Sequence, residues 1–514
     1  MNLADSLTQA AFKWPNKTAL VFEGRRWTYL QWNRWVNQTA HAFRAAGIGH
    51  GDRVAFLTYN LPEQVTGFYA LMKIGAIPVP INYRLAPNEV KYIVDDSRSR
   101  ILVFEEDLRV PVAAIRADLA VEKLIYIGTR PEAGEIPFDS FVEPGADGEP
   151  EAQVGWHDPA FIMYTSGTTG RPKGVVRSHL AENMGSMSMA LECGFRHDDI
   201  ILNNKPLFHI AQLQIQFVPF VQLGGTNVLT RGFDVDETLS LVGRERITTL
   251  HGVPTQMVMI AAADLSKYDL ATLRCGFYGG QTLADDVTRK CMAMFPQYFL
   301  NVYGSTEALA VTACDYRLHP GKLGSVGHAA VNMDVRIIRA DSREPDDLCK
   351  PGAIGQLITR GPSVFTEYLG LPERTAAAFI KGWFCSGDAA FADEEGFITV
   401  MGRMDHTIKS GGENIHPSEV ENVLFMHPGV ANAAAVGLPS AKWGQAVCAA
   451  VVRRDPALSA EALDQFCRAS HDLATFKRPR HYFFIDEIPA NPTGKVERGK
   501  LKDLLLARFP APLE

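Results

Sequence analysis

The sequence predicts an α/β protein, with a large N-terminal domain of layered β-sheets and helices and a small α+β C-terminal domain. Short apolar segments alternate with helical stretches through most of the chain, which is typical of layered, largely parallel sheets. The pattern changes to closely spaced strands over 333–403, and a distinct tail follows. The 514 residues are enough for two or more domains.

The N-terminal elements are predicted from hydrophobic periodicity. Residues 53–58, 76–82 and 100–106 are short apolar strands, whereas 61–76 has the apolar spacing of a helix that ends near a glycine. A segment rich in proline, glycine and acids, 143–155, is a loop.

The second half of the chain supplies further strands and the tail. Strands are expected at 333–340, 355–361 and 396–403, followed by a hinge within 402–412. The expected elements of the tail are a proline-started helix at 417–428, strands at 431–438, 448–454 and 481–488, and a helix around 460–470.

Composition argues against several functional classes. The net charge of −7 disfavours broad binding to nucleic acid or anionic membranes. Eight scattered cysteines without a CxxC pair indicate reduced thiols rather than disulfides or a zinc site. The N-terminus lacks a signal pattern, and no apolar stretch has the length of a membrane span. We therefore expect a cytoplasmic protein with no membrane span and no nucleic-acid partner.

One loop has the composition of a phosphate-binding segment. In YTSGTTGRPKGVV (164–176), every residue from Thr165 to Gly170 is hydroxylic or glycine, and Lys173 follows. The amides and hydroxyls of such a loop wrap a polyphosphate, and the lysine adds a point charge. The spacing excludes a P-loop, in which the lysine directly follows the second glycine. A flexible linker has the same composition, so this loop alone leaves both interpretations open.

A second segment, NVYGSTEALA (301–310), carries groups suited to a nucleotide. Tyr303 is suited to stacking on a base, Thr306 to donating to a phosphate, and Glu307 to holding a divalent cation. Taken alone, the segment is equally an ordinary turn before a helix.

The third and fourth segments are WFCSGDAAF (383–391) and GRMDHTIKSGGENIHPSEVE (402–421). Asp388 is suited to accepting from two ribose hydroxyls, and Arg403 to reaching ribose or phosphate. Asp405 lies where a hinge is expected. An ordinary turn aspartate and a plain interdomain turn explain the same residues.

A fifth segment, NPTGKVERGKL (491–501), places Lys495 after a turn. In this order, the five segments resemble the motifs of the adenylate-forming enzymes, which comprise acyl-CoA synthetases, peptide-synthetase adenylation domains and beetle luciferases. The resemblance covers nearly the whole chain. It implies an N-terminal adenylation domain (1–404) and a mobile C-terminal domain (405–514), with the hinge near Asp405.

The resemblance also implies a reaction in two halves. A carboxylate attacks the α-phosphate of ATP and releases pyrophosphate, and a thiol then attacks the acyl adenylate and releases AMP. ATP, Mg²⁺ and coenzyme A are the implied ligands. Adenylation gives the acid a leaving group, and the site must stabilise the charge on the phosphates while it forms.

Roles are carried over only at matching positions. Thr306 resembles the α-phosphate contact, Glu307 the magnesium ligand, and Lys495 the lysine that bridges carboxylate and α-phosphate. Asp405 resembles the hinge residue, although His406 stands where the family usually has another acid. The implied ATP-binding residues are Thr165, Ser166, Gly167, Thr168, Thr169, Gly170 and Lys173 at the phosphates, Gly279, Gly280, Gln281, Asn301 and Tyr303 around adenine, and Asp388 and Arg403 at ribose, together with Gly304 and Ser305.

The segment after the hinge favours the acyl-CoA synthetase branch. Its SGGEN stretch is close to the form found in CoA ligases, and the residues implied for CoA are Ser410, Gly411, Gly412, Glu413, Trp443, Phe476, Lys477 and Arg478. A solvent-exposed basic turn explains residues 476–479 as readily as contact with CoA does. A peptide-synthetase module is expected to continue into a carrier domain and to have an aspartate in the PLFHIAQL region, where none is present. Nothing in the chain calls for a luciferase.

The acyl pocket is expected around PLFHIAQL, where His209 resembles a histidine at the pocket wall. The other expected lining residues are Met184, Ile210, Ala211, Gln212, Val253, Tyr278, Leu309 and Ala310, with Met187 and Met189 as further wall or plain core. Because this set contains no lysine or arginine, it disfavours a dicarboxylate.

The expected substrate is therefore an aryl or short-to-medium aliphatic monocarboxylic acid. The overall pattern is similar to chlorobenzoate-type and crotonobetaine/carnitine-type CoA ligases, and the sequence does not choose between them. An enzyme that loads a separate carrier protein and a non-catalytic nucleotide-binding relative stay open as alternatives. A homodimer is compatible with each of them.

Overall fold

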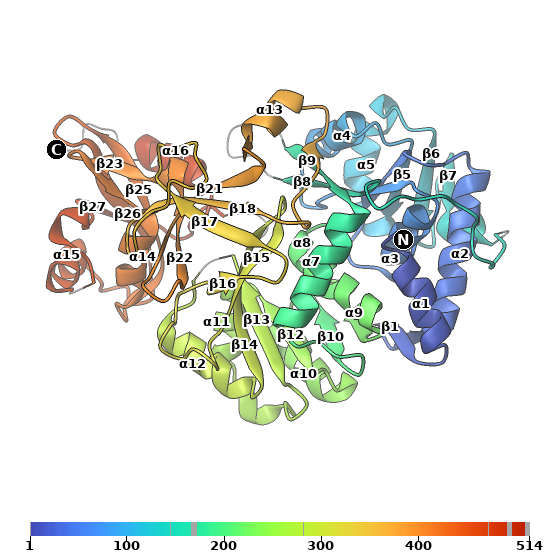
Figure 1. Cartoon of the computed structure of the whole chain (residues 1–514), viewed down its shortest axis with the longest axis horizontal. Coiled ribbons are helices and arrows are strands. Elements are labelled where there is room, and N and C mark those ends of the chain that lie inside the picture. The colour runs from blue at the N-terminus through green and yellow to red at the C-terminus, as the bar shows by residue number, and fades with distance from the viewer. Residues whose placement is uncertain are drawn as a thin grey trace.

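The computed structural model describes residues 2–143, 145–165, 172–280, 282–470, 472–490 and 496–508. Three sheets with their helices form the larger part of the molecule, a fourth lies beside them, and a small lobe follows at the C-terminal end (Figure 1). The predicted α/β fold class is confirmed. None of the described helices is both long enough and apolar enough to cross a membrane.

The first sheet is parallel and contains the three strands expected near the N-terminus. Its order is β4 (Ile77–Pro80), β3 (Arg53–Leu57), β5 (Ile101–Glu105), β6 (Lys123–Ile127) and β7 (Glu135–Pro137). The nearby helices are α1 (Asp5–Lys13), α2 (Tyr29–Ala45), α3 (Pro62–Lys73), α4 (Pro87–Asp96), α5 (Arg109–Ile115) and α6 (Phe138–Val142).

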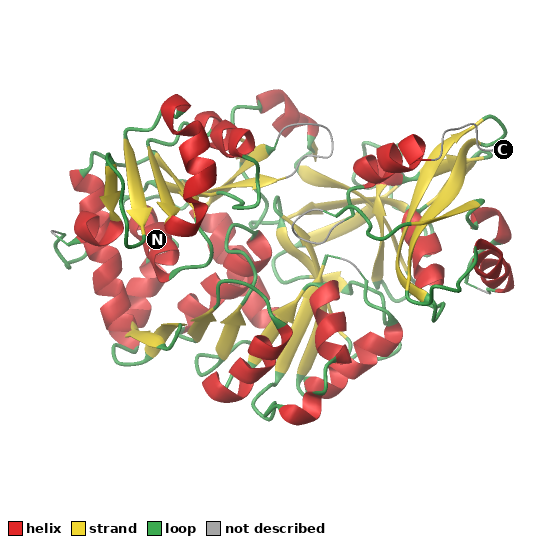
Figure 2. Cartoon of the chain, turned by 180° about the vertical axis from the view of Figure 1, so that it is seen from behind, coloured by secondary structure: helices red, strands yellow, loops and turns green. Residues whose placement is uncertain are grey.

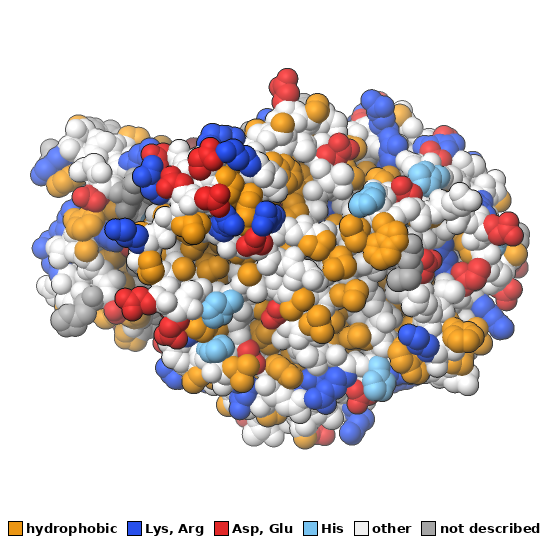
Figure 3. Space-filling view, viewed as in Figure 1, with side chains coloured by type: hydrophobic (Ala, Val, Ile, Leu, Met, Phe, Trp, Pro, Cys, Tyr) orange, Lys and Arg blue, Asp and Glu red, His pale blue; other side chains and the backbone are white. Residues whose placement is uncertain are grey.

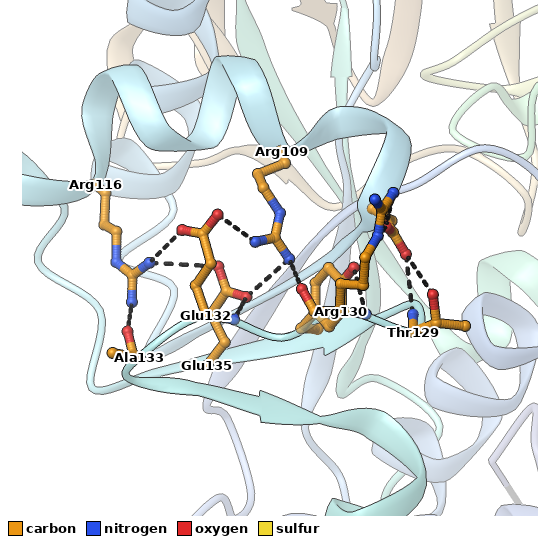
Figure 4. A network of polar contacts seen from close by, with 9 residues as sticks. Arg109, Arg116, Thr129, Arg130, Glu132, Ala133 and Glu135 are labelled. Carbon is orange, nitrogen blue, oxygen red and sulfur yellow. Dashed lines mark hydrogen bonds and ion pairs between the residues drawn. The ribbon is translucent and has the colours of Figure 1, made fainter.

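An ion-pair network closes the β7 edge of this sheet (Figure 4). Arg109 of α5 and Arg116, which directly follows α5, both bind Glu135, at 3.1 and 3.3 Å, and Glu132 lies between them. Arg130 binds Glu106 at 2.7 Å. The network fastens α5 to the chain around β7, so the last strand is held although it has only one neighbour.

The second sheet has nine strands and a parallel centre. Its order is β16 (His328–Ala329), β15 (Leu309–Asp315), β14 (Tyr298–Ser305), β13 (Cys275–Gly279), β12 (Thr249–Gly252), β10 (Ile200–Asn203), β11 (Thr226–Leu229), β1 (Thr18–Phe22) and β2 (Arg25–Thr28). The helices of this region are α7 (His179–Glu192), α8 (Ile210–Gln212), α9 (Val218–Leu223), α10 (Val235–Glu245), α11 (Pro254–Ala262) and α12 (Asp285–Met294) (Figure 2).

Helices α2 and α3 contribute to one large apolar core with residues of both sheets. Trp32 of α2, Phe68 of α3 and Phe56 of β3 are fully buried there, together with Phe217 from the chain after α8. The indole N–H of Trp32 donates to Thr66 at 3.0 Å, which satisfies its only polar atom.

Two smaller sheets follow. One is antiparallel, in the order β19 (Glu367–Tyr368), β9 (Lys173–Ser178) and β8 (Pro159–Thr165). The other has the order β17 (Asp334–Ile338), β18 (Gly355–Arg360), β21 (Trp383–Ala392) and β20 (Phe379–Ile380), with β22 (Ile398–Arg403) paired to β21. Helix α13 (Pro372–Ala377) connects β19 to β20.

The C-terminal lobe is an α+β unit, as expected. Its sheet has the order β24 (Glu413–Ile415), β23 (Ile408–Ser410), β26 (Gly444–Arg453) and β25 (Val430–Ser440), with β27 (His481–Phe484) paired to β26. Its helices are α14 (Pro417–Phe425), α15 (Ala460–Ala469) and α16 (Arg498–Arg508). The last strand is shorter than the sequence indicated.

Apolar side chains are exposed along α7. Met187 and Leu191 on this helix and Val331 beside it are exposed, and Val331 exchanges hydrogen bonds with Ser188 and Glu192. Figure 3 shows apolar side chains gathered on the central part of the same face. Met187 therefore points to solvent rather than into a pocket wall.

Candidate functional site

The glycine- and hydroxyl-rich loop joins the two strands of an antiparallel pair. Thr165 at the end of β8 lies opposite Lys173 at the start of β9. Ser166, Gly167, Thr168, Thr169 and Gly170 lie outside the described residues. The paired strands fix both ends of the loop, which a free linker would not require.

Lys173 lies in a small cluster with Tyr368 and Glu307. Its Nζ is 4.5 Å from the centre of the Tyr368 ring, and the Tyr368 hydroxyl donates to Glu307 Oε1 at 2.9 Å. Burial lowers the pKa of Lys173, Arg374 and Arg403 lower it further, and Glu307 opposes them. Arg374 and Arg403 are therefore close enough to Lys173 to act on its charge, and neighbouring cations of this kind suit a polyphosphate.

Thr306 and Glu307 lie in the turn between β14 and β15. The sequence offered a turn before a helix, but the turn leads into an antiparallel strand, with Ser305 opposite Leu309. Gly304 makes this turn possible, because a Cβ there would stand 1.8 Å from the Leu309 carbonyl oxygen. Leu309 itself has a φ of +54°, which is costly for a branched side chain.

A buried ion pair contacts the backbone of the same turn. Arg177 at the end of β9 pairs with Glu182 of α7, and both side chains are fully buried. The guanidinium also donates to the carbonyl of Thr306 at 3.0 Å and to that of Ser363 at 2.9 Å. Arg177 thereby fixes the backbone immediately before Glu307.

We expect Arg177→Met to destabilise the protein by about 3–5 kcal/mol, because it leaves Glu182 buried without its partner. Urea unfolding followed by tryptophan fluorescence measures this change. The double variant Arg177→Met/Glu182→Leu is expected to recover much of the loss, since it removes both charges. Equal midpoints for wild type and the single variant would show that the pair does not stabilise the fold.

The implied adenosine contacts come from the three strands β14, β21 and β22. The Tyr303 hydroxyl donates to Asp388 Oδ2 at 2.5 Å, and Asp388 lies opposite Arg403 in the β21–β22 pair. Arg403 Nη1 is 3.8 Å from Asp388 Oδ1. Burial, and after it Asp388, raises the pKa of Tyr303 well above its usual range, so this hydroxyl stays protonated.

The residues expected around adenine belong to the neighbouring strands. Gly279 lies opposite Val302, and Asn301 opposite Tyr278, in the β13–β14 pair. The Asn301 amide donates to Tyr316 at 3.0 Å and to the Ser325 carbonyl at 3.1 Å. Gly280 adopts a φ of +95°, and Gln281 lies outside the described residues.

Asp405 lies in a short helical turn, Met404–His406, between the fourth sheet and the C-terminal lobe. Strand β22 ends at Arg403 and β23 begins at Ile408. Asp405 is 3.5 Å from Arg403 and 3.9 Å from the His406 ring. The expected hinge residue thus forms an ion pair with the ribose candidate Arg403.

The segment after the hinge forms a surface around Trp443. Ser410 lies opposite Glu413 in the β23–β24 pair, and the Gly411 N–H donates to the Trp443 carbonyl at 2.9 Å. Gly411 and Gly412 have φ values of +61° and +87°, and a Cβ on Gly411 would press on the Trp443 ring.

The expected basic CoA contacts are already paired. Lys477 binds Glu419, and Arg478 Nε donates to Asp464 at 2.8 Å, while Phe476 is 44% exposed. To bind a phosphate of CoA, Lys477 and Arg478 would each have to break the ion pair with its carboxylate partner.

Sequence reasoning missed two cations beside these residues. Lys442 and Arg480 lie 5.1 and 5.2 Å from the centre of the Trp443 ring. Only their positions hinted at them, since Lys442 directly precedes Trp443 and Arg480 directly follows 476–479. Lys495 lies outside the described residues.

The residues expected to line the acyl pocket divide among three apolar clusters. Ile210 and Leu309 share one cluster, Ala310 and Met189 a second, and Tyr278 a third. The Tyr278 and Tyr316 hydroxyls lie 3.2 Å apart, and Tyr316 also accepts from Asn301. Met184, Ala211 and Val253 are half-buried. Burial lowers the pKa of His209 to about 4, so this imidazole is neutral at physiological pH.

Gln212 is fully buried and already satisfied. Its Oε1 accepts the backbone N–H of Lys205 at 3.0 Å, and its Nε2 donates to Asn203 and, at 3.2 Å, to Gln216. It therefore positions its neighbours rather than facing a substrate. The neighbour that it holds is a lysine, which the expected lining lacked.

Glu307 fits a magnesium ion of the kind implied by the sequence. Magnesium is held through one or two carboxylates together with substrate phosphates rather than in an all-protein cage. Among the described residues, no group of three or more His, Cys, Asp or Glu side chains is arranged to hold a metal. A single carboxylate beside Lys173 agrees with binding through the phosphates.

Comparisons with known proteins find AMP-binding enzymes and CoA ligases as relatives over nearly the whole chain. Residues 7–369 match the family described as AMP-binding enzyme, and residues 419–495 match the AMP-binding enzyme C-terminal domain. An indoleacetate–CoA ligase of Aromatoleum aromaticum is 34% identical over 522 residues, with 98% of each chain covered. A fatty acid–acyl-carrier-protein ligase, ScoC, of Streptomyces coeruleorubidus is 34% identical over 509 residues, which cover 95% of this chain and 93% of that one.

A solved structure shows the same likeness. The crystal structure of the anthranilate CoA ligase AuaEII in complex with anthranoyl-AMP has a TM-score of 0.90 and 27% identity to this chain. The match covers 99% of this chain and 98% of that one.

Proposed function

We propose that this enzyme activates an aryl or short-to-medium aliphatic monocarboxylic acid. The chain belongs to the AMP-binding enzyme family and is an AMP-forming acid–CoA ligase. The enzyme forms an acyl adenylate from the acid and ATP and then transfers the acyl group to CoA. In the first step a carboxylate oxygen bonds to the α-phosphorus and pyrophosphate leaves. In the second step the CoA thiol bonds to the acyl carbon and AMP leaves.

The proposed phosphate side of the site is the cluster at the ends of the glycine-rich loop. Lys173 supplies a fixed positive charge, and the Thr306 hydroxyl contacts the α-phosphate. Glu307, oriented by the Tyr368 hydroxyl, is the proposed magnesium ligand. Magnesium would offset the negative charge of the phosphates. Lys495 is proposed to hold the acid carboxylate and the α-phosphate together.

The proposed adenosine side uses side chains that the fold already links. Tyr303 stacks on the base, and Asp388 and Arg403 hold the ribose. The hydrogen bond from Tyr303 to Asp388 keeps the two contacts in one orientation.

The observation that carries the substrate proposal is that Ile210, next to the neutral His209 in the chain, and Leu309 belong to the same buried apolar cluster. Such walls favour an aryl or alkyl group over a charged one. The relatives named for indoleacetate and anthranilate are consistent with an aryl acid.

The test is pyrophosphate release across a library of aryl and aliphatic acids, with CoA present and absent. We expect the best substrates to be aryl or short-to-medium aliphatic acids, each with acid-dependent pyrophosphate and CoA-dependent AMP. A preference for long-chain acids would contradict the proposal. ATP binding without pyrophosphate release for any acid would identify a non-catalytic relative.

Loading of a carrier protein is a second candidate, favoured by the likeness to the ScoC ligase. Replacing CoA with a pantetheinyl carrier protein in the same assay distinguishes a carrier-loading enzyme from a CoA ligase. Acyl transfer to the carrier with free CoA inert would establish the second candidate.

The compartment belongs to the same proposal. All eight cysteines are free thiols in the structure, which supports the reducing environment of the cytoplasm. A homodimer also remains a proposal, and size-exclusion chromatography with light scattering tests it.

A further inference from the structure

Lys205 is a buried lysine that pairs with no carboxylate of the described residues. It follows β10, is only 5% exposed, and donates through Nζ to the His251 carbonyl at 2.7 Å and to Asn204 Oδ1 at 3.1 Å. An ammonium group has three N–H donors, and the described residues accept two of them. No ion pair among the described residues includes it.

The other buried cations of the described residues show how unusual this is. Lys73 pairs with Glu149 at 2.6 Å, Arg177 pairs with Glu182, and Arg274 pairs with Asp199. Buried charges in proteins are normally paired in this way, because an isolated one is costly. Lys205 is the exception, and its third donor has no acceptor among the described residues.

Lys205 follows a central strand of the nine-stranded sheet. It lies just beyond β10, in the parallel centre of the nine-stranded sheet, at the edge where the carboxyl ends of β10, β12 and β13 meet. Ligands of α/β proteins bind at that edge. His209 and Val253, both expected at the acyl pocket, follow the same two strand ends, four residues after Lys205 and two after His251.

The surrounding amides hold Lys205 in place. Gln212 accepts the Lys205 backbone N–H, and Gln212 also bonds Gln216, whose amide contacts the His251 ring. The His251 ring stacks on Phe277, with centroids 4.6 Å apart. A side chain fixed by this many partners needs little reorganisation when a ligand arrives.

We infer that Lys205 reads the far end of the acyl group, and that the substrate acid carries an oxygen acceptor there. The acceptor is a second carboxylate, a carbonyl or a hydroxyl, and the free N–H of Lys205 donates to it. This inference rests on the proposed function: a carbonyl or hydroxyl acceptor narrows its substrate class, whereas a second carboxylate would replace the monocarboxylic acid with a dicarboxylic one. It disfavours acids with a quaternary ammonium group, because that group would meet a buried cation.

The pH dependence of KM gives an independent check. Burial lowers the pKa of Lys205 to about 7. The titratable groups facing it are His251 and His209, and burial lowers the pKa of each, that of His209 to about 4. Both rings are therefore neutral near pH 7. Because the protonated lysine is the binding form, KM for an acceptor-bearing acid is expected to rise as the pH increases through about 7.

The experiment compares matched acids on the full-length enzyme. Pentanoate is set against levulinate and glutarate, and benzoate against para-hydroxybenzoate and terephthalate. The wild type is expected to prefer the acceptor-bearing member of at least one pair by about 10- to 100-fold in kcat/KM, as a hydrogen bond to a charged group contributes. Glutarate against levulinate, and terephthalate against para-hydroxybenzoate, distinguish an anionic acceptor from a neutral one.

Lys205→Met is expected to bring that ratio close to one. Lys205→Gln, which keeps an N–H donor without the charge, is expected to give an intermediate ratio and serves if the methionine variant does not fold. Lys267→Met, at an exposed lysine paired with Asp264, is the control and should keep the wild-type ratio.

Three outcomes would overturn the inference. They are a wild-type ratio near one for every pair, an unchanged ratio in a folded Lys205 variant, and a KM that stays constant from below to above pH 7. The absence of pyrophosphate release with any acid would instead overturn the proposed function itself.

Discussion

Lys495→Ala is expected to lower the rate of acyl-adenylate formation by at least about 100-fold, because the ammonium group stabilises charge that develops only as carboxylate and α-phosphate react. Thioester formation from a supplied acyl adenylate is expected to stay near the wild-type rate, since that half-reaction no longer joins those groups. Single-turnover assays of the two half-reactions measure both rates.

Lys500→Ala is the matched control for this variant. Lys500 is an exposed lysine of α16 that pairs with Glu497 at 2.9 Å, and both half-reactions should keep their rates when it is lost. Equal losses in both half-reactions of the Lys495 variant would show that the assigned role is wrong.

Glu307→Gln is expected to lower adenylation by about 100- to 1,000-fold and to raise the Mg²⁺ concentration needed for half-maximal activity. The substitution keeps the size of the side chain and an oxygen that accepts from Tyr368, but it removes the charge that holds the cation. Titration of pyrophosphate release with Mg²⁺ measures both effects.

Tyr368→Phe separates orientation from charge. It removes the 2.9 Å hydrogen bond to Glu307 but keeps the carboxylate, so a loss of about 10-fold or less is expected. A Glu307→Gln enzyme with the wild-type Mg²⁺ dependence would contradict the assignment of Glu307 as the metal ligand.

Local pattern was enough to predict the order of the elements. Strands β3, β4 and β5 and helix α3 lie within the ranges expected from apolar spacing and the proline and glycine signals. These features depend on neighbours in sequence, so a single chain reveals them. The turn at Thr306 was the failure, because its continuation as a strand depends on pairing with β14 and on the close approach of Gly304 to Leu309.

The site was less predictable where partners are distant in sequence. Lys477 and Arg478, expected to contact CoA, form ion pairs with Glu419 and Asp464. Neither acid is a close neighbour of its partner in the sequence. Lys205 carried no signal, since its unusual state depends on His251 and on the absence of an acid nearby. The hydrogen bonds of Gln212 to Asn203 and Gln216 were equally unpredictable, because they appear only in the folded protein.

The central claim is that one site makes an acyl adenylate and then a CoA thioester. The most direct measurement mixes enzyme, acid and labelled ATP without CoA and adds CoA afterwards. The account predicts acid-dependent pyrophosphate first, with enzyme-bound acyl adenylate, and a burst of AMP and acyl-CoA after the addition. Formation of ADP and phosphate, or an adenylate that does not react with CoA, would contradict it.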